Sequence, residues 1–143
     1  MSSDSRRVAG VLLVILPTVM IGGVSILTLL IGTPEYMVNA LRQDLWRAGH
    51  AHAGVFFLLS LIALRYVDEA VLSERAKWIV RSSIPAAAII VPFAFFFSVL
   101  TPDATKPNGL IQLAYVGAAV LAIGVIILGM GLLRKQPPVG GRA

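Results

Sequence analysis

The sequence contains no cysteine, only two histidines among 143 residues, and few charged residues. The absence of cysteine excludes disulfides, thiolate metal sites and catalysis by a thiol. Charged residues make up 13% of the chain, against about 25% in typical soluble domains. No Gly-rich phosphate loop, HExxH or GxSxG motif is present. The sequence therefore indicates a protein that is neither soluble nor an enzyme.

Long apolar runs take the place of charge, and the mean hydropathy is +0.86. The longest run, Val8 to Gly32, extends for 25 residues without a charge. A helix needs about 20 such residues to cross the hydrocarbon core of a bilayer, and continuous runs lack the alternation of barrel strands. The sequence predicts an all-α membrane protein that forms a four-helix bundle. The four predicted transmembrane helices cover 8–32, 48–66, 80–100 and 110–133.

The cationic residues are distributed unevenly between the two sides of this predicted bundle. Nine of them lie in the N-terminal segment, the loop after the second span and the tail 134–143, and three lie on the other side. Because cationic loops stay in the cytoplasm, both termini are expected to be cytoplasmic, with the protein in the inner (cell) membrane. The nine are Arg6, Arg7, Arg65, Arg75, Lys77, Arg81, Arg134, Lys135 and Arg142, and the three are Arg42, Arg47 and Lys106.

Two further consequences follow from this charge pattern. The first span follows Arg6 and Arg7 but is much longer than the about 7–15 residues of a signal peptide, so we expect a retained signal-anchor. The net charge of +5 is carried by short loops that cannot build a basic folded surface, so nucleic acid is not an expected partner.

The acidic residues Asp68, Glu69 and Glu74 share a basic loop, and we interpret that loop as solvated.

A shift of 68 residues aligns the two halves of the chain. It predicts an internal repeat of two tandem helical hairpins, related by an axis along the membrane normal. The alternative is chance, because matches between apolar residues are common in such a sequence. The aligned positions are Arg7 with Arg75, Pro17 with Pro85, Gly49 with Gly117, and Thr33-Pro34-Glu35 with Thr101-Pro102-Asp103.

A short outer amphipathic helix is predicted over 34–46. Pro34 suits the first position of a helix, and Met37, Leu41 and Leu45 share one face at intervals of four residues. A straight helix through to the second span would project far beyond the bilayer. We therefore expect this helix to lie at the interface and to bend into the span near Gly49.

His50 and His52 begin the second span, where ionisable side chains usually mark function. At 100° per residue they point about 160° apart, so both cannot bind one metal ion or one haem from a regular helix. A haem site would need a dimer or a methionine ligand such as Met20 or Met130. The alternative to a functional role is structural, in which each imidazole binds a backbone carbonyl or a neighbouring side chain.

Several polar residues are predicted to lie near these histidines on the outer side of the membrane. We expect one histidine to contact this cluster and the other to contact a backbone carbonyl or a partner subunit. Together they form a candidate ligand or proton site, in which no metal is expected. The candidate site residues are His50, His52, Arg47, Asp44, Glu35, Asp103, Gln112 and Tyr115.

Small residues recur at positions that allow close helix packing. Gly117, Gly124 and Gly131 follow each other every seven residues in the fourth span, and Gly49 and Ala53 form a second pair. Such patterns let helices approach closely in lipid. We interpret them as contacts within the chain, with an oligomer interface as the alternative.

These observations favour a non-enzymatic four-helix inner-membrane protein that is a subunit or accessory of a larger membrane assembly. Its expected partners are the lipid bilayer and either other subunits or further copies of the chain, and it needs no cofactor. A small transporter or channel that uses the outer polar cluster is the first alternative. A redox protein that binds haem, quinone or copper is the second.

Overall fold

The computed structural model describes residues 1–135, which are helical apart from short connections and contain no strand. The tail predicted over 134–143 lies outside the described residues except for its first two positions. The elements are α1 (Ser3–Gly32), α2 (Pro34–Met37), α3 (Ala40–Tyr66), α4 (Glu74–Ser98), the 3-10 helix η1 (Gly109–Gln112) and α5 (Leu113–Leu133).

The four long helices are α1, α3, α4 and the unit formed by η1 with α5. Each has the length and the apolar composition that crossing a membrane requires. This confirms the predicted all-α architecture with four spanning helices, and the chain is a multi-pass membrane protein. The helices begin outside the apolar runs because polar side chains cap them, with Ser2, Asn39 and Ser73 each accepting a hydrogen bond from a backbone N–H three residues later.

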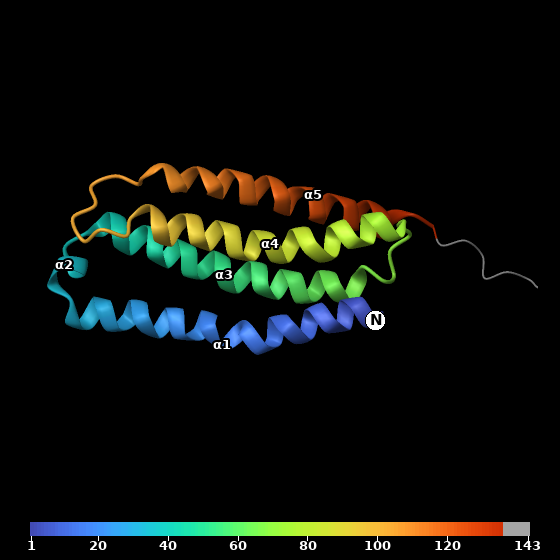
Figure 1. Cartoon of the computed structure of the whole chain (residues 1–143), viewed down its shortest axis with the longest axis horizontal. Coiled ribbons are helices and arrows are strands. Elements are labelled where there is room, and N and C mark those ends of the chain that lie inside the picture. The colour runs from blue at the N-terminus through green and yellow to red at the C-terminus, as the bar shows by residue number, and fades with distance from the viewer. Residues whose placement is uncertain (136–143) are drawn as a thin grey trace, which may run out of the picture.

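The long helices form a row in the order α5, α4, α3 and α1, so that α4 and α3 are the two inner helices (Figure 1). α4 packs against α3 on one side and against α5 on the other, while α1 packs against α3. In the most apolar window of α4, 50% of the residues are buried, whereas only 6% are buried in that of α1. α1 therefore forms an edge of the row that remains largely uncovered by the rest of the chain.

The two ends of the row differ in what they bring together. At one end, called here the terminal end, the N-terminus meets the loop 67–73 through a hydrogen bond of 2.6 Å from Ser2 N–H to Asp68. The end of α5 meets the same loop, where Val71 N–H donates to the carbonyl of Gly131. The opposite or distal end contains α2, the loop 99–108 and η1.

The outer helix is shorter than the sequence indicates. A separate helix is present at the distal end, but it covers only Pro34–Met37, and the break falls at Val38–Asn39 instead of near Gly49. The side chain of Asn39 accepts from Arg42 N–H and starts α3 there, so residues 40–46 continue into the span as one helix through Gly49. The local capping signal of Asn39 thus outweighs the amphipathic pattern.

Three glycines of α5 pack closely against other parts of the chain, Gly117 and Gly124 against α4 and Gly131 against the loop 67–73. A Cβ atom at Gly117 would come within 2.5 Å of Val91, one at Gly124 would overlap Ser83 Oγ, and one at Gly131 would come within 2.5 Å of Leu72. Gly49 of α3 also faces α4, where a Cβ would lie 3.1 Å from Phe95 and Phe96. Ala53 is partly buried on the same helix as Gly49.

Two apolar clusters hold the remaining interfaces. Leu12 of α1 packs with Phe57 and Leu64 of α3, which attaches α1 to the row. The second cluster joins α3 and its following loop to α4 through Ala63, Val67, Val80 and Ile84.

Substitution of Gly124 by alanine should destabilise the protein. The new methyl group would overlap Ser83 Oγ and the Ile84 side chain, and overpacking of this kind costs about 1–3 kcal/mol. The free energy of unfolding in mixed detergent–SDS micelles measures the effect. Gly129→Ala is the matched control on the same helix, because a Cβ there meets nothing within 4 Å. Equal stability of the two variants would contradict the close α4–α5 contact.

Candidate functional site

His52 faces α4 and is bound within the chain. Its Nδ1 lies 2.7 Å from the carbonyl oxygen of Ala48, one turn earlier in α3, so Nδ1 carries the proton that this carbonyl accepts. The centre of the imidazole ring lies 5.2 Å from the ring centre of Phe95 in α4 and 5.3 Å from the ring centre of Phe56. These contacts satisfy one ring nitrogen and pack the imidazole between aromatic groups, which is a structural arrangement.

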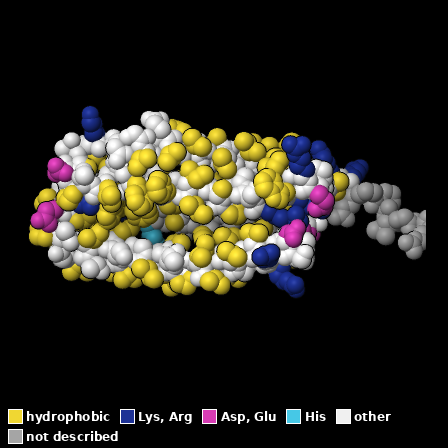
Figure 2. Space-filling model, in the orientation of Figure 1, with side chains coloured by type: hydrophobic (Ala, Val, Ile, Leu, Met, Phe, Trp, Pro, Cys, Tyr) yellow, Lys and Arg dark blue, Asp and Glu magenta, His cyan; other side chains and the backbone are white. Residues whose placement is uncertain are grey.

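His50 points in a different direction and contacts α1. Its Nε2 lies 2.9 Å from the place that a Cβ of Gly23 would occupy, and its Nδ1 lies 3.8 Å from the corresponding place at Gly22. The two glycines thus leave room for the ring directly against the backbone of α1. Within residues 1–135 the imidazole makes no hydrogen bond, and His50 is partly exposed. Figure 2 shows histidine atoms reaching the surface in a furrow of the visible face.

The other candidate residues do not gather around the histidines. Arg47 and Asp44 form an exposed ion pair of 2.9 Å, which contributes little to stability. Gln112 and Tyr115 are exposed and belong to η1 and α5, at the opposite edge of the row from α1. No hydrogen bond or ion pair joins either histidine to the polar candidates in the part of the chain that the structure describes. The expected contact between a histidine and this cluster is therefore not formed.

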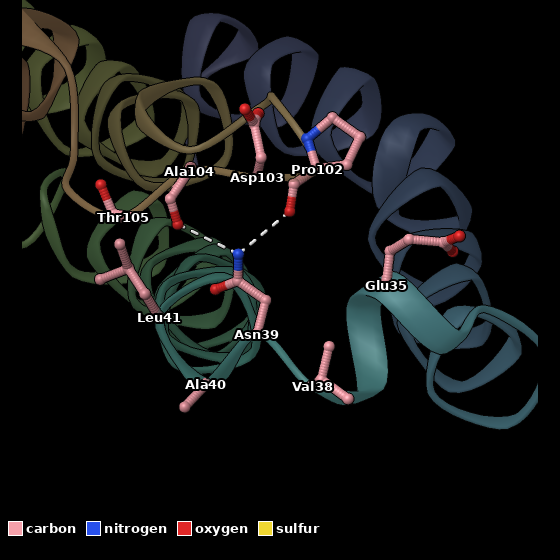
Figure 3. A pocket seen from close by; sticks show the side chains of 9 residues that line it. All are labelled: Glu35, Val38, Asn39, Ala40, Leu41, Pro102, Asp103, Ala104 and Thr105. Atoms are coloured by element: carbon pink, nitrogen blue, oxygen red, sulfur yellow. Dashed lines mark hydrogen bonds between the residues drawn. The ribbon is translucent and has the colours of Figure 1, made fainter.

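Glu35 and Asp103 line a shallow hollow of about 600 Å³ at the distal end (Figure 3). The amide of Asn39 spans its floor and donates hydrogen bonds of 3.0 Å to the carbonyls of Pro102 and Ala104. The two carboxylates are exposed and extend in different directions. Asn39 thereby ties the start of α3 to the loop 99–108, and the carboxylates give the hollow a negative rim.

Arg42 is a buried cation at the distal end that the sequence interpretation left outside the site. Its side chain is only 6% exposed. Nε donates to the carbonyl of Val99 at 3.2 Å and Nη2 to that of Leu100 at 3.4 Å, just beyond the end of α4. The guanidinium also lies 4.7 Å from the Trp46 ring. A cation here satisfies carbonyls that α4 leaves free and complements the negative end of its dipole.

Tyr36 is buried beside this arginine, with 1% of its surface exposed, and its ring centre lies 5.7 Å from the guanidinium. Burial raises the pKa of its phenol, and the nearby charges of Arg47 and Arg42 oppose that rise. The hydroxyl makes no hydrogen bond within the described chain. The aromatic pair of Tyr36 and Trp46 therefore encloses Arg42 and keeps it from water.

The terminal end holds a second buried arginine, which the interpretation of a solvated loop missed. Arg81 of α4 is 8% exposed and donates to Asp68 at 2.7 Å and to Ser5 Oγ at 3.0 Å. Ser2 contributes its backbone N–H to Asp68 and its hydroxyl to Arg81. Asp68 is thus the partner of a buried cation, and together these side chains fasten α1 to α4. No local pattern reveals contacts between residues 13 to 79 positions apart.

The pKa of Asp68 shows how strongly this cluster favours its charged form. Burial is the largest single influence and would raise the pKa, but hydrogen bonds from Ser2 N–H, Arg81, and the Ser2 and Ser5 side chains together lower it to about 2. The ordinary value is 3.8. A carboxylate with this pKa stays ionised over the whole physiological range.

Metal and haem sites need ligands that converge. Residues 1–135 contain no group of three or more histidine, cysteine, aspartate or glutamate side chains that could hold a metal ion. His50 and His52 diverge between α1 and α4, so they do not form a joint site. Comparison with protein-family models, curated proteins and solved structures gives no significant match. The functional argument therefore rests on the residues of this chain.

Protonation of Asp68 should weaken the fold at low pH. Because the folded pKa lies below the unfolded one, the stabilisation is complete above pH 4 and is lost as the pH falls towards 2. The shift corresponds to about 2 kcal/mol. Asp68→Asn should remove this part of the pH dependence, measured as the free energy of unfolding in detergent between pH 5 and pH 2. The matched control is Asp103→Asn at the exposed distal loop, and an equal change in both variants would contradict the assignment.

Proposed function

We propose that this chain is a non-enzymatic subunit of a larger assembly in the inner membrane, and that it joins its partner through the edge formed by α1 and α3. The observation that supports this best is His50, an imidazole within a spanning helix that has no hydrogen-bond partner in residues 1–135. An unsatisfied polar group away from water costs of order 1–3 kcal/mol. A partner that brings a hydrogen-bonding group to His50 would remove this cost.

The rest of this edge supports a membrane helix as the partner. The hydroxyls of Thr18, Ser25 and Thr28 each donate to a carbonyl of α1 itself, at 2.7 to 2.9 Å. α1 therefore offers an almost entirely apolar surface, and His50 of the neighbouring α3, which lies against Gly22 and Gly23 of α1, is the polar side chain that still needs a partner. Helix association in lipid depends on close packing and on interhelical hydrogen bonds of this kind.

Removal of the imidazole should release the chain from its assembly. His50→Leu is expected to lower the ratio of assembled to free chain by about three- to tenfold, the worth of one hydrogen bond between helices. His50→Gln should retain part of the assembly, since its amide can also form hydrogen bonds. The size of the native complex after extraction from its own membranes in mild detergent measures both effects, and mass spectrometry identifies what it contains.

His52→Leu is the matched control, because the contacts of His52 all lie within the chain. A complex built from this chain alone would identify the partner as further copies of itself. Migration as a free monomer before and after chemical crosslinking in native membranes would contradict the proposal. Haem absorbance or bound copper that disappears in His50→Leu would instead support the redox alternative.

A small transporter or channel is the second candidate, and the distal hollow is the observation that favours it. The carboxylates of Glu35 and Asp103 at its rim would concentrate cations from the surrounding water. This function would also require a hydrated path from the hollow to the middle of the bilayer.

We infer that both termini are cytoplasmic. The terminal end joins Ser2 to the loop after α3, and that loop to the end of α5. Lys and Arg side chains gather at this end in Figure 2. Because cationic segments are retained in the cytoplasm, this end should face inwards.

Reporter fusions test this orientation. A reporter placed after Lys135 should be active only if it is a cytoplasmic type, whereas one inserted in the exposed distal loop between Asp103 and Lys106 should report the outer side. The opposite pair of results would reverse the orientation. Substitution of Arg6 and Arg7 together by glutamine should weaken the bias, because the first helix usually dominates topology.

We also propose that the two hairpins arose by duplication. Shifted back by 68 positions, α4 covers 6–30 and η1 with α5 covers 41–65, which fall inside α1 and α3 respectively. The corresponding glycines have different neighbours, however. Gly117 faces α4, the first helix of its own hairpin. Gly49, which corresponds to Gly117, does not face α1, the first helix of its hairpin, but faces α4 of the other hairpin. After duplication, the surface around Gly49 would have become the contact between the two hairpins.

A further inference from the structure

A second, smaller hollow lies at the terminal end, between the first two turns of α1 and the second and third turns of α4. Its volume is about 320 Å³. The residues that line it are Asp4, Arg7, Val8, Trp78, Arg81 and Ser82. We call it the basic hollow, because two guanidinium groups share its wall.

The basic hollow lies at the level where the membrane surface is expected. Arg7 directly precedes the charge-free run of α1, which begins at Val8, and Arg81 directly precedes that of α4, which begins at Ser82. Two helices therefore pass from polar to apolar sequence at the same hollow. The headgroups of the surrounding lipids lie at this boundary.

The side chains of the basic hollow have hydrogen-bond donors to spare. Nε and Nη2 of Arg81 are engaged by Ser5, Ser2 and Asp68, but Nη1 makes no hydrogen bond, and its nearest acidic atom is Glu74 Oε2 at 3.9 Å. Arg7 is exposed and has no hydrogen bond or ion pair within the described chain. A pair of guanidinium groups, one held rigidly and one free to move, suits a phosphate ligand.

Trp78 adds the third element of a lipid headgroup site. Its side chain is 65% exposed, and its indole N–H has no acceptor within residues 1–135. Tryptophan favours the interface between membrane and water because it combines an apolar ring with a polar N–H. Here it lies beside the two arginines on the wall of the basic hollow.

The charge balance favours an anion. Asp68 forms an ion pair with Arg81, and the negative charge of Asp4 on the wall of the hollow offsets the positive charge of Arg7. The terminal end as a whole nevertheless carries eight cationic and four acidic residues within the described chain. Beside Arg7, the surface of α1 continues into an apolar strip over Gly10, Val11 and Val14, which also line a shallow depression. The strip gives an acyl chain a place to lie below a headgroup bound at Arg7.

We propose that the basic hollow binds one anionic glycerophospholipid from the surrounding leaflet. Arg7 and Nη1 of Arg81 hold the phosphate, Trp78 donates its indole N–H to the headgroup, and an acyl chain lies along α1 from Gly10 to Val14. The buried cluster of Asp68, Ser5 and Ser2 keeps Arg81 in place for this contact. The site is separate from the α1–α3 edge near His50, which lies deeper in the membrane.

Native mass spectrometry of the detergent-purified chain tests this proposal, with phosphatidylglycerol and phosphatidylcholine as competing probes. We expect one phosphatidylglycerol to be retained in preference to phosphatidylcholine. Arg7→Gln should reduce its binding by about fivefold, as expected for one arginine at an anionic surface. Arg7 is exposed, so this variant should unfold at the same temperature as the native chain. Trp78→Phe should also weaken binding, because the ring remains while the N–H is lost.

Arg75→Gln is the matched control, since Arg75 is exposed at the same end but does not line the basic hollow. It should change the binding of phosphatidylglycerol by less than about twofold. An equal loss in Arg7→Gln and Arg75→Gln would show that only diffuse charge attracts the lipid, and this would overturn the proposal. Equal retention of phosphatidylcholine would do the same. Displacement by millimolar inorganic phosphate would identify a site for a free anion instead of a lipid.

Discussion

A bilayer offers no water to polar groups, and this constraint governs the arrangement of the chain. Several hydroxyls within the spans donate to carbonyls of their own helices, as Ser25 does to Ile21 and Ser60 to Phe56, whereas that of Ser83 is buried against α5 without a partner in the described chain. The imidazole of His52 likewise forms a hydrogen bond with the carbonyl of Ala48 in its own helix. Charged side chains are confined to the two ends, where they form ion pairs, donate to free carbonyls at the end of a helix or are exposed. His50 differs from these side chains because its imidazole has no partner in the described chain and is also partly exposed at the surface of the row.

The inner helix α4, which packs against both α3 and α5, is secured at both ends by buried arginines. At the terminal end its own Arg81 joins Asp68 and Ser5, which brings the start of α1 to α4. At the distal end Arg42 of α3 binds the carbonyls that follow α4, under the cover of Tyr36 and Trp46. Between these points the contacts are apolar and close, because glycine brings α5 against α4. The polar contacts at the two ends and the close glycine contacts between them together fix how the helices are aligned along the row.

The two proposed binding sites both border α1, at different depths in the membrane and beside different neighbouring helices. His50 lies within the span, on the side of α3 that faces α1, and is suited to a partner helix. The basic hollow lies where α1 enters the membrane and is suited to a headgroup. α1 is attached to the row by the Leu12 cluster, by the polar cluster at its start and by the contact of His50 with Gly22 and Gly23, and the rest of its surface is exposed. A weakly covered helix is the element best placed to meet other components of the membrane.

The sequence by itself determined the four helices and the divergence of the two histidines. Both are local properties: span length follows from bilayer thickness, and direction around a helix follows from 100° per residue. Only the tertiary structure decided which surfaces meet. Three contacts join residues that are far apart in the chain. Arg81 pairs with Asp68, His50 packs against Gly22 and Gly23, and Arg42 binds the carbonyl of Val99. The glycines spaced seven apart in α5 mark its buried face in the sequence, but they do not say which helix this face meets, and packing alone selects that neighbour.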